Sequence, residues 1–105
     1  MAEPITLTQL LEDSKEAKGI IEESIKTFNE GIKELNTAIS EADKLISEEK
    51  DSDNRYQLMQ HKSAALQIKA SYIKQLEEVE KNLNELKGVI RLVEKAIQLN
   101  TGDIF

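Results

Sequence analysis

A heptad repeat of apolar residues, interrupted once, is the feature that most constrains how this chain folds. Apolar side chains recur in alternating steps of three and four over residues 7–46, and the repeat resumes over residues 58–97. A repeat of this kind gives a helix one apolar stripe, and such stripes pack together as in coiled coils. The pattern therefore predicts two long amphipathic helices.

The heptad positions of the two helices can be assigned residue by residue. In the first helix, the a positions are Leu11, Lys18, Ile25, Ile32, Ile39 and Ile46, and the d positions are Leu7, Ser14, Ile21, Phe28, Leu35 and Ala42. In the second helix, the d positions are Leu58, Ala65, Tyr72, Val79, Leu86 and Val93, and the a positions include Leu76, Leu83, Ile90 and Ile97. β-Branched residues at a with Leu or Phe at d are typical of coiled coils.

The helix ends carry capping signals. Thr6 and Gln9 fit a capping box, and the polar segment 47–54 offers Ser52 and Asp53 as N-caps. Gly102 fits a C-cap. The expected boundaries are a first helix at about residues 6–49, a turn at 50–54, a second helix at about 54–100 and a short tail at 101–105.

The turn is too short for anything but an antiparallel pair of helices. We therefore predict an all-α fold: a single domain, residues 1–105, that is an antiparallel two-helix hairpin. Self-association or a partner helix would complete it into a bundle. The register that matches a with d places Tyr72 beside Gly31. It also brings Lys62 near Glu41 and Lys69 near Glu34.

The apolar face is wider than the a and d positions alone. The flanking g positions are Leu10, Ala17, Ser24, Gly31, Ala38 and Leu45 in the first helix and include Ile68, Val89 and Ala96 in the second. Small residues let another helix approach closely, so this face predicts a groove for a helix of a second copy or of another protein. The alternative is that it only widens the contact within the hairpin.

Two further apolar patches are candidate contacts with another chain. Met59, Leu66 and Ile73 occupy e positions of the second helix, away from the hairpin seam. At the open end of the hairpin, where its termini meet, an apolar cluster is expected from Leu10, Leu11, Val89, Leu92, Val93, Ala96, Leu99, Ile104 and Phe105. Ile104 and Phe105 follow the second helix, where they either fold back on the hairpin or dock into a partner.

Charge and composition exclude several functions. The formal net charge of −6 argues against nucleic-acid and anionic-membrane binding, and no apolar run is long enough to span a bilayer. Residues 1–4 show no signal peptide, so we expect a cytoplasmic protein or one exported without a classical signal.

Catalytic chemistry has little support in the sequence. The chain has no cysteine and one histidine, His61, and its glycines are isolated. Metal centres and phosphate-binding loops need clusters that are absent here. We therefore expect no enzyme activity, no metal and no cofactor.

In architecture, a helical hairpin of this length is similar to the WXG100 proteins of type VII secretion and to type III needle subunits. The motifs that define those families are missing, however. The chain has no tryptophan and so no Trp-x-Gly turn, and Tyr72 is followed four residues later by Leu76, not by the acidic residue of a Tyr-x-x-x-Asp/Glu motif. The sequence is therefore assigned to no family.

The function expected from this sequence is non-enzymatic protein–protein contact. The chain would be a helical-hairpin subunit, adaptor or chaperone of a larger assembly, for example one associated with secretion. The alternative is a small acidic inhibitor, such as a phage-encoded protein that blocks a host factor.

Overall fold

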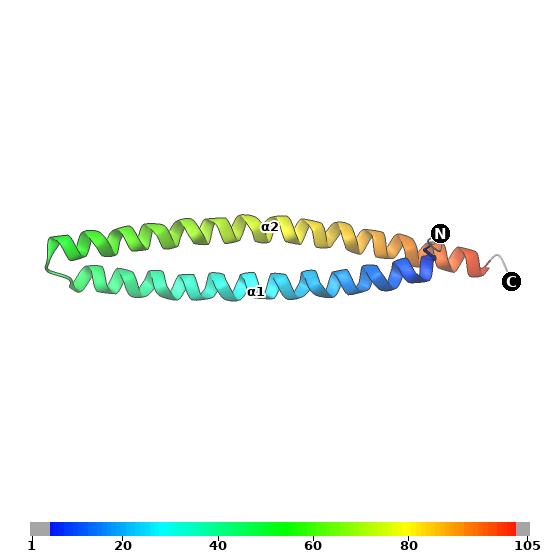
Figure 1. Ribbon diagram of the computed structural model, residues 1–105, viewed down its shortest axis with the longest axis horizontal. Helices are drawn as coiled ribbons and strands as arrows, with labels where there is room; N and C mark the ends of the chain where they lie inside the picture. Colours follow the sequence, from blue (N-terminus) through cyan, green and yellow to red (C-terminus); the bar gives the residue numbers. More distant parts are fainter. Residues whose placement is uncertain (1–4, 103–105) are drawn as a thin grey trace. The chain divides into compact units, whose positions relative to one another are not determined.

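The computed structural model describes residues 5–102, which form two α-helices: α1, Leu7–Glu48, and α2, Ser52–Gly102 (Figure 1). No strand occurs among these residues. The helices are joined by a short turn and run antiparallel, so the fold is an all-α helical hairpin. This confirms the fold class that the heptad repeat predicts.

The turn is shorter than expected and covers residues 49–51. The N-cap of α2 is Asp51, whose Oδ1 accepts hydrogen bonds from the backbone N–H groups of Asp53 at 2.9 Å and Asn54 at 3.5 Å. The expectation of a cap at Ser52 or Asp53 is therefore wrong. A cap at Asp51 lets α2 begin at Ser52 rather than near residue 54.

The other ends also differ in part from the expectation. The backbone N–H of Gln9 donates to Thr6 Oγ1 at 3.0 Å, which confirms Thr6 as the N-cap of α1. The Gln9 side chain does not complete a capping box, because its Nε2 donates to Asp13 Oδ1 at 3.0 Å. At the far end α2 includes Gly102, so the expected C-cap lies inside the helix.

Arg55, near the start of α2, bonds across the connection between the two helices. Its Nη2 and Nε donate to the backbone carbonyl of Glu49, at 2.6 Å and 3.2 Å. The last carbonyls of a helix have no partner within the helix, and a cation is favourable at that end of the helix dipole. The last turn of α1 contains no basic residue. Arg55 therefore supplies the positive charge and the hydrogen-bond donors at the end of α1.

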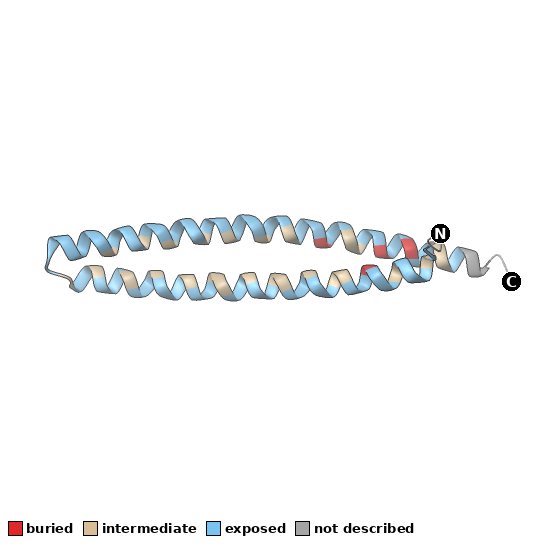
Figure 2. Cartoon of the chain, viewed as in Figure 1, coloured by how far each residue is buried: buried red, intermediate tan, exposed pale blue. Residues whose placement is uncertain are grey.

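Contacts divide the hairpin into two compact units, each built from a segment of both helices. Unit 1 combines α1 up to Ile25 with α2 from Val79, and unit 2 is Lys26–Glu78. Within each unit, every a and d residue that the sequence analysis names is buried or half-buried (Figure 2). The heptad assignment is thereby confirmed.

The two units differ in how deeply their seam residues are buried. The buried residues of unit 1 are Leu83, Ile90, Val93 and Ser14, between 5% and 8% exposed. No described residue of unit 2 is as deeply buried as these four (Figure 2). The seam of unit 2 includes Lys62 and Lys69 at a positions. Because their ammonium groups must reach water, the residues of this seam remain partly exposed to solvent.

Candidate functional site

Three g positions of unit 2 are apolar and exposed, with the polar residues His61 and Gln75 on either side of Ile68 along α2. Leu45 is 53% exposed and Ile68 is 48% exposed, and Ala38, opposite Ile68 in the antiparallel register, is also exposed. We call Ala38, Leu45 and Ile68 the g face of unit 2. Small and apolar groups side by side on two helices leave room for a third helix.

Gly31 belongs to the same row but is not open to a partner in the same way. A Cβ atom built on Gly31 would lie 2.7 Å from Cε2 of Tyr72, so the tyrosine ring already fills that space. The predicted neighbourhood of Tyr72 and Gly31 is confirmed. Gly31 is small because of a contact inside the hairpin, and it therefore gives no argument for a partner.

The opposite side of α2 in unit 2 carries a second apolar row. Met59, Leu66 and Ile73 are 52%, 45% and 38% exposed. Tyr56 was not predicted to belong to this row, but it is 62% exposed and lies three residues before Met59. Its three-residue spacing from Met59 was the signal that could have found it.

Unit 1 has an exposed apolar face of its own. Leu10 is 39% and Val89 is 44% exposed, whereas the smaller candidates Ala17, Ser24 and Ala96 are half-buried. The Ser24 hydroxyl donates to the carbonyl of Ile20 at 3.1 Å and so is satisfied within α1.

Three further apolar residues of unit 1 are strongly exposed. They are Ile20, Leu92 and Leu99, which are 63%, 69% and 62% exposed. Leu92 and Leu99 alternate with Val89 and Ala96 in steps of three and four, so one side of α2 is apolar from residue 89 to residue 99. Leu92 and Leu99 belong to the apolar cluster expected at the open end of the hairpin, whereas Ile20 was not predicted to be part of any apolar surface.

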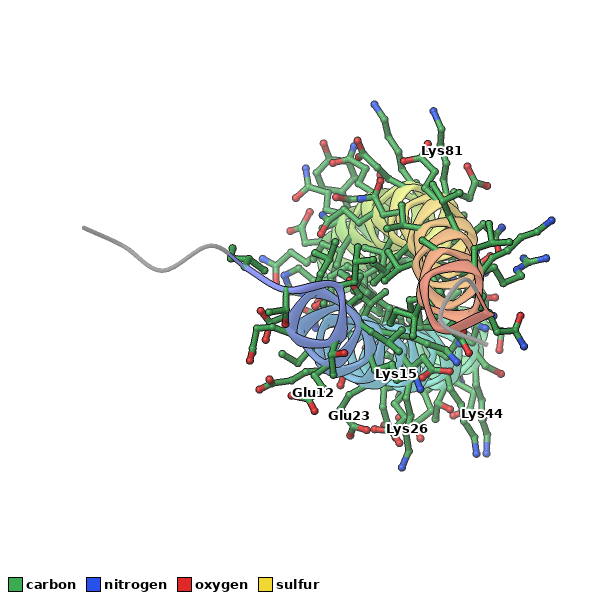
Figure 3. The ribbon with its side chains drawn as sticks, turned by 90° about the vertical axis from the view of Figure 1, so that its right-hand side faces the viewer. Glu12, Lys15, Glu23, Lys26, Lys44 and Lys81 are labelled. Atoms are coloured by element: carbon green, nitrogen blue, oxygen red, sulfur yellow. The ribbon has the colours of Figure 1, made fainter. Side chains whose placement is uncertain are left out.

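Charged side chains lie mainly on the outer surfaces. Figure 3 shows Glu12, Glu23, Lys26 and Lys44 extending outward from α1, and Lys81 from α2. An ion pair joins Lys62 Nζ to Asp43 Oδ1 at 2.5 Å, so the expected acidic neighbour Glu41 is replaced by Asp43, two residues further along α1. No ion pair joins Lys69 to Glu34, both of which lie in the described part of the chain.

Chemically reactive groups are sparse in the part of the chain that the structure describes. His61 is exposed on α2. No group of three or more His, Cys, Asp or Glu within residues 5–102 could hold a metal ion. No buried side-chain polar atom there lacks a hydrogen-bond partner. The features left to explain are therefore the exposed apolar faces.

The candidates Ile104 and Phe105 lie outside the described residues. Neither α1 nor α2, over residues 5–102, contains an apolar stretch long enough to cross a membrane. No protein-family model, curated protein or solved structure matches the chain.

Proposed function

We propose that this chain is a non-enzymatic protein-interaction module that binds helical partners through its exposed apolar faces. Its role would be that of a subunit, adaptor or chaperone in a larger assembly. The observation that carries the proposal is the balance of apolar burial. Three large apolar residues are buried, whereas twelve are at least 38% exposed within the described residues.

The positions of the exposed residues support binding more than their number does. Single exposed apolar residues are ordinary on protein surfaces, but rows of them indicate an interaction site. Here they follow helical spacing, so each row presents a stripe along one side of a helix. A stripe of that form is complementary to another amphipathic helix.

The g face of unit 2 is the best place to test the proposal. Ala38 and Ile68 are exposed, and neither is part of the seam between α1 and α2. Substituting them therefore alters the surface while leaving the packing within the hairpin unchanged. Ala38→Gln adds bulk and a polar amide where a partner helix would approach.

The test compares capture of partners by three forms of the chain: wild type, Ala38→Gln and the control Lys44→Gln. Lys44 extends from the outer side of α1, away from the g face (Figure 3). Partners identified by quantitative mass spectrometry are then purified, and their affinities are measured by calorimetry. We expect Ala38→Gln to weaken binding about tenfold or more, and Lys44→Gln to leave it unchanged.

The proposal fails if purified partners bind all three forms equally and substitutions in the other apolar rows also have no effect. The identity of a captured partner separates the two roles open from sequence. Components of an assembly favour a subunit, adaptor or chaperone, and an enzyme whose activity falls on binding favours the acidic inhibitor.

A further inference from the structure

α2 carries a complete second row of uncharged residues in unit 2. Six residues make up this outer row: Tyr56, Met59, Ser63, Leu66, Ala70 and Ile73. Their spacing alternates strictly between three and four, all six are exposed, and none is charged. α2 therefore has two coiled-coil seams in this unit, one against α1 and one with no partner in the hairpin.

We propose that the outer row is the contact surface of a symmetric dimer, in which α2 of one copy packs antiparallel against α2 of a second copy. This inference rests on the proposed function and identifies a second copy of the chain as the partner for this row. A two-fold axis crosses the row between Ser63 and Leu66.

The apolar side chains of the row complement each other about that axis. Tyr56 lies opposite Ile73 of the second copy, Met59 opposite Ala70, and Leu66 opposite Ser63. Two of these three layers therefore match a large residue with a small one, which is how packed helical layers fill space without voids. A row of uniformly large residues would not interdigitate in this way.

The charges along the outer edge of the row give independent support. Asp53, Gln60, Gln67 and Lys74 follow the row at intervals of seven and are all exposed. In the antiparallel dimer Asp53 lies opposite Lys74 of the second copy, and Gln60 lies opposite Gln67. Opposite charges at flanking positions determine partner and orientation in coiled coils. A parallel in-register dimer would instead pair the outer edge with the inner edge, and it would place Lys74 against Lys69 of the second copy.

α1 is consistent with the same axis. Lys33 and Asp43 are exposed on the side of α1 that neighbours the outer row. The axis brings Lys33 within about one helical turn of Asp43 of the second copy. The inner edge of the row carries Lys62 and Lys69, whose like charges oppose dimerisation. Asp43 already bonds Lys62, so part of that charge is compensated.

The first test is a charge exchange monitored by sedimentation velocity over about 1–100 μM, which detects dissociation constants in that range. We expect wild type to be dimeric at the upper end. Lys74→Glu places two like-charged pairs at the outer edges and should weaken the dimer about tenfold. Asp53→Lys should do the same, and the double variant should restore dimerisation. Circular dichroism checks that each variant remains helical.

The second test determines the register by disulfide crosslinking, which the absence of native cysteine makes specific. We expect Met59→Cys protein mixed with Ala70→Cys protein to form a mixed disulfide dimer. Each single variant alone should crosslink poorly, since antiparallel packing places identical residues eleven positions apart, about 16 Å. Crosslinking of each variant with itself would overturn the antiparallel arrangement.

These outcomes are separable from the fate of the proposed function. A wild-type chain that stays monomeric at about 100 μM overturns the dimer, whatever partners the g face binds. Conversely, Ala38→Gln should leave the dimer intact, because Ala38 lies on the other side of the hairpin. A dimer that dissociates on Ala38→Gln but withstands Lys74→Glu would assign self-association to the g face instead.

Discussion

The ring of Tyr72 fills the space beside Gly31, where an added Cβ atom would lie 2.7 Å from Cε2 and 3.1 Å from Cδ2. Phe28 packs edge-to-face against the same ring, with 5.7 Å between centroids and 85° between planes. The glycine, the tyrosine and the phenylalanine together form the aromatic contact of unit 2. Tyr72 is confined by Phe28, so it cannot turn freely away from a larger residue at position 31.

This geometry predicts that Gly31→Ala destabilises the hairpin. Alanine in a helix is favoured over glycine by up to about 1 kcal/mol, but overpacking against an aromatic ring costs about 1–3 kcal/mol. We expect a net loss of about 1 kcal/mol in urea unfolding monitored by circular dichroism.

Gly19 and Gly88 are matched controls for that experiment. No neighbouring atom lies within 4 Å of a Cβ added at either position. Gly88→Ala and Gly19→Ala should therefore raise the free energy of unfolding by a few tenths to about 1 kcal/mol. If Gly31→Ala stabilises the protein as much as Gly88→Ala does, Tyr72 does not occupy that space in solution.

Burial predicts where apolar truncation matters. Leu83→Ala removes one of the three buried apolar side chains, 8% exposed, and should cost about 2–4 kcal/mol. Leu92→Ala lies on the same helix but is 69% exposed, and it should cost less than about 0.5 kcal/mol. Thermal unfolding must be compared at one protein concentration, because self-association raises the apparent stability. Equal losses at both positions would contradict the seam.

The sequence was sufficient for the fold because one periodicity determines it. Ile32, Leu83 and Tyr72 all follow the three–four spacing, and a short polar turn permits only an antiparallel pair. The contact between Tyr72 and Gly31 could also be predicted, since the register alone places them together.

The exact turn and the second apolar rows could not be predicted as readily. Ser52, Asp53 and Asp51 are all good N-caps, and the closeness of Arg55 to the end of α1 helps select Asp51. Tyr56 and Ile20 were overlooked because each helix was assigned one seam. The solvent exposure of a side chain is defined only once the two helices are packed together. It shows whether an apolar residue belongs to a second row or to the edge of the seam.

The turn provides a further prediction. Asp51→Ala removes the acceptor of two backbone N–H groups at the start of α2 and should cost about 1 kcal/mol. Ser52→Ala should be nearly neutral, because Ser52 lies inside the helix and is exposed. Asp51→Asn keeps the side-chain oxygen and should recover most of the loss. A larger effect of Ser52→Ala than of Asp51→Ala in chemical denaturation would move the cap back to Ser52.

The ion pair between Lys62 and Asp43 is expected to add little stability. The two side chains are 33% and 54% exposed, so water and salt screen their attraction. A double-mutant cycle with Lys62→Gln and Asp43→Asn should give a coupling energy of about 0.2–1 kcal/mol at low salt, falling toward zero near 1 M salt. Because Asp43 also faces the proposed dimer, the cycle must be measured at a concentration where the chain is monomeric. A coupling energy that stays unchanged at high salt would show that the pair is shielded from solvent, contrary to the exposure of both side chains.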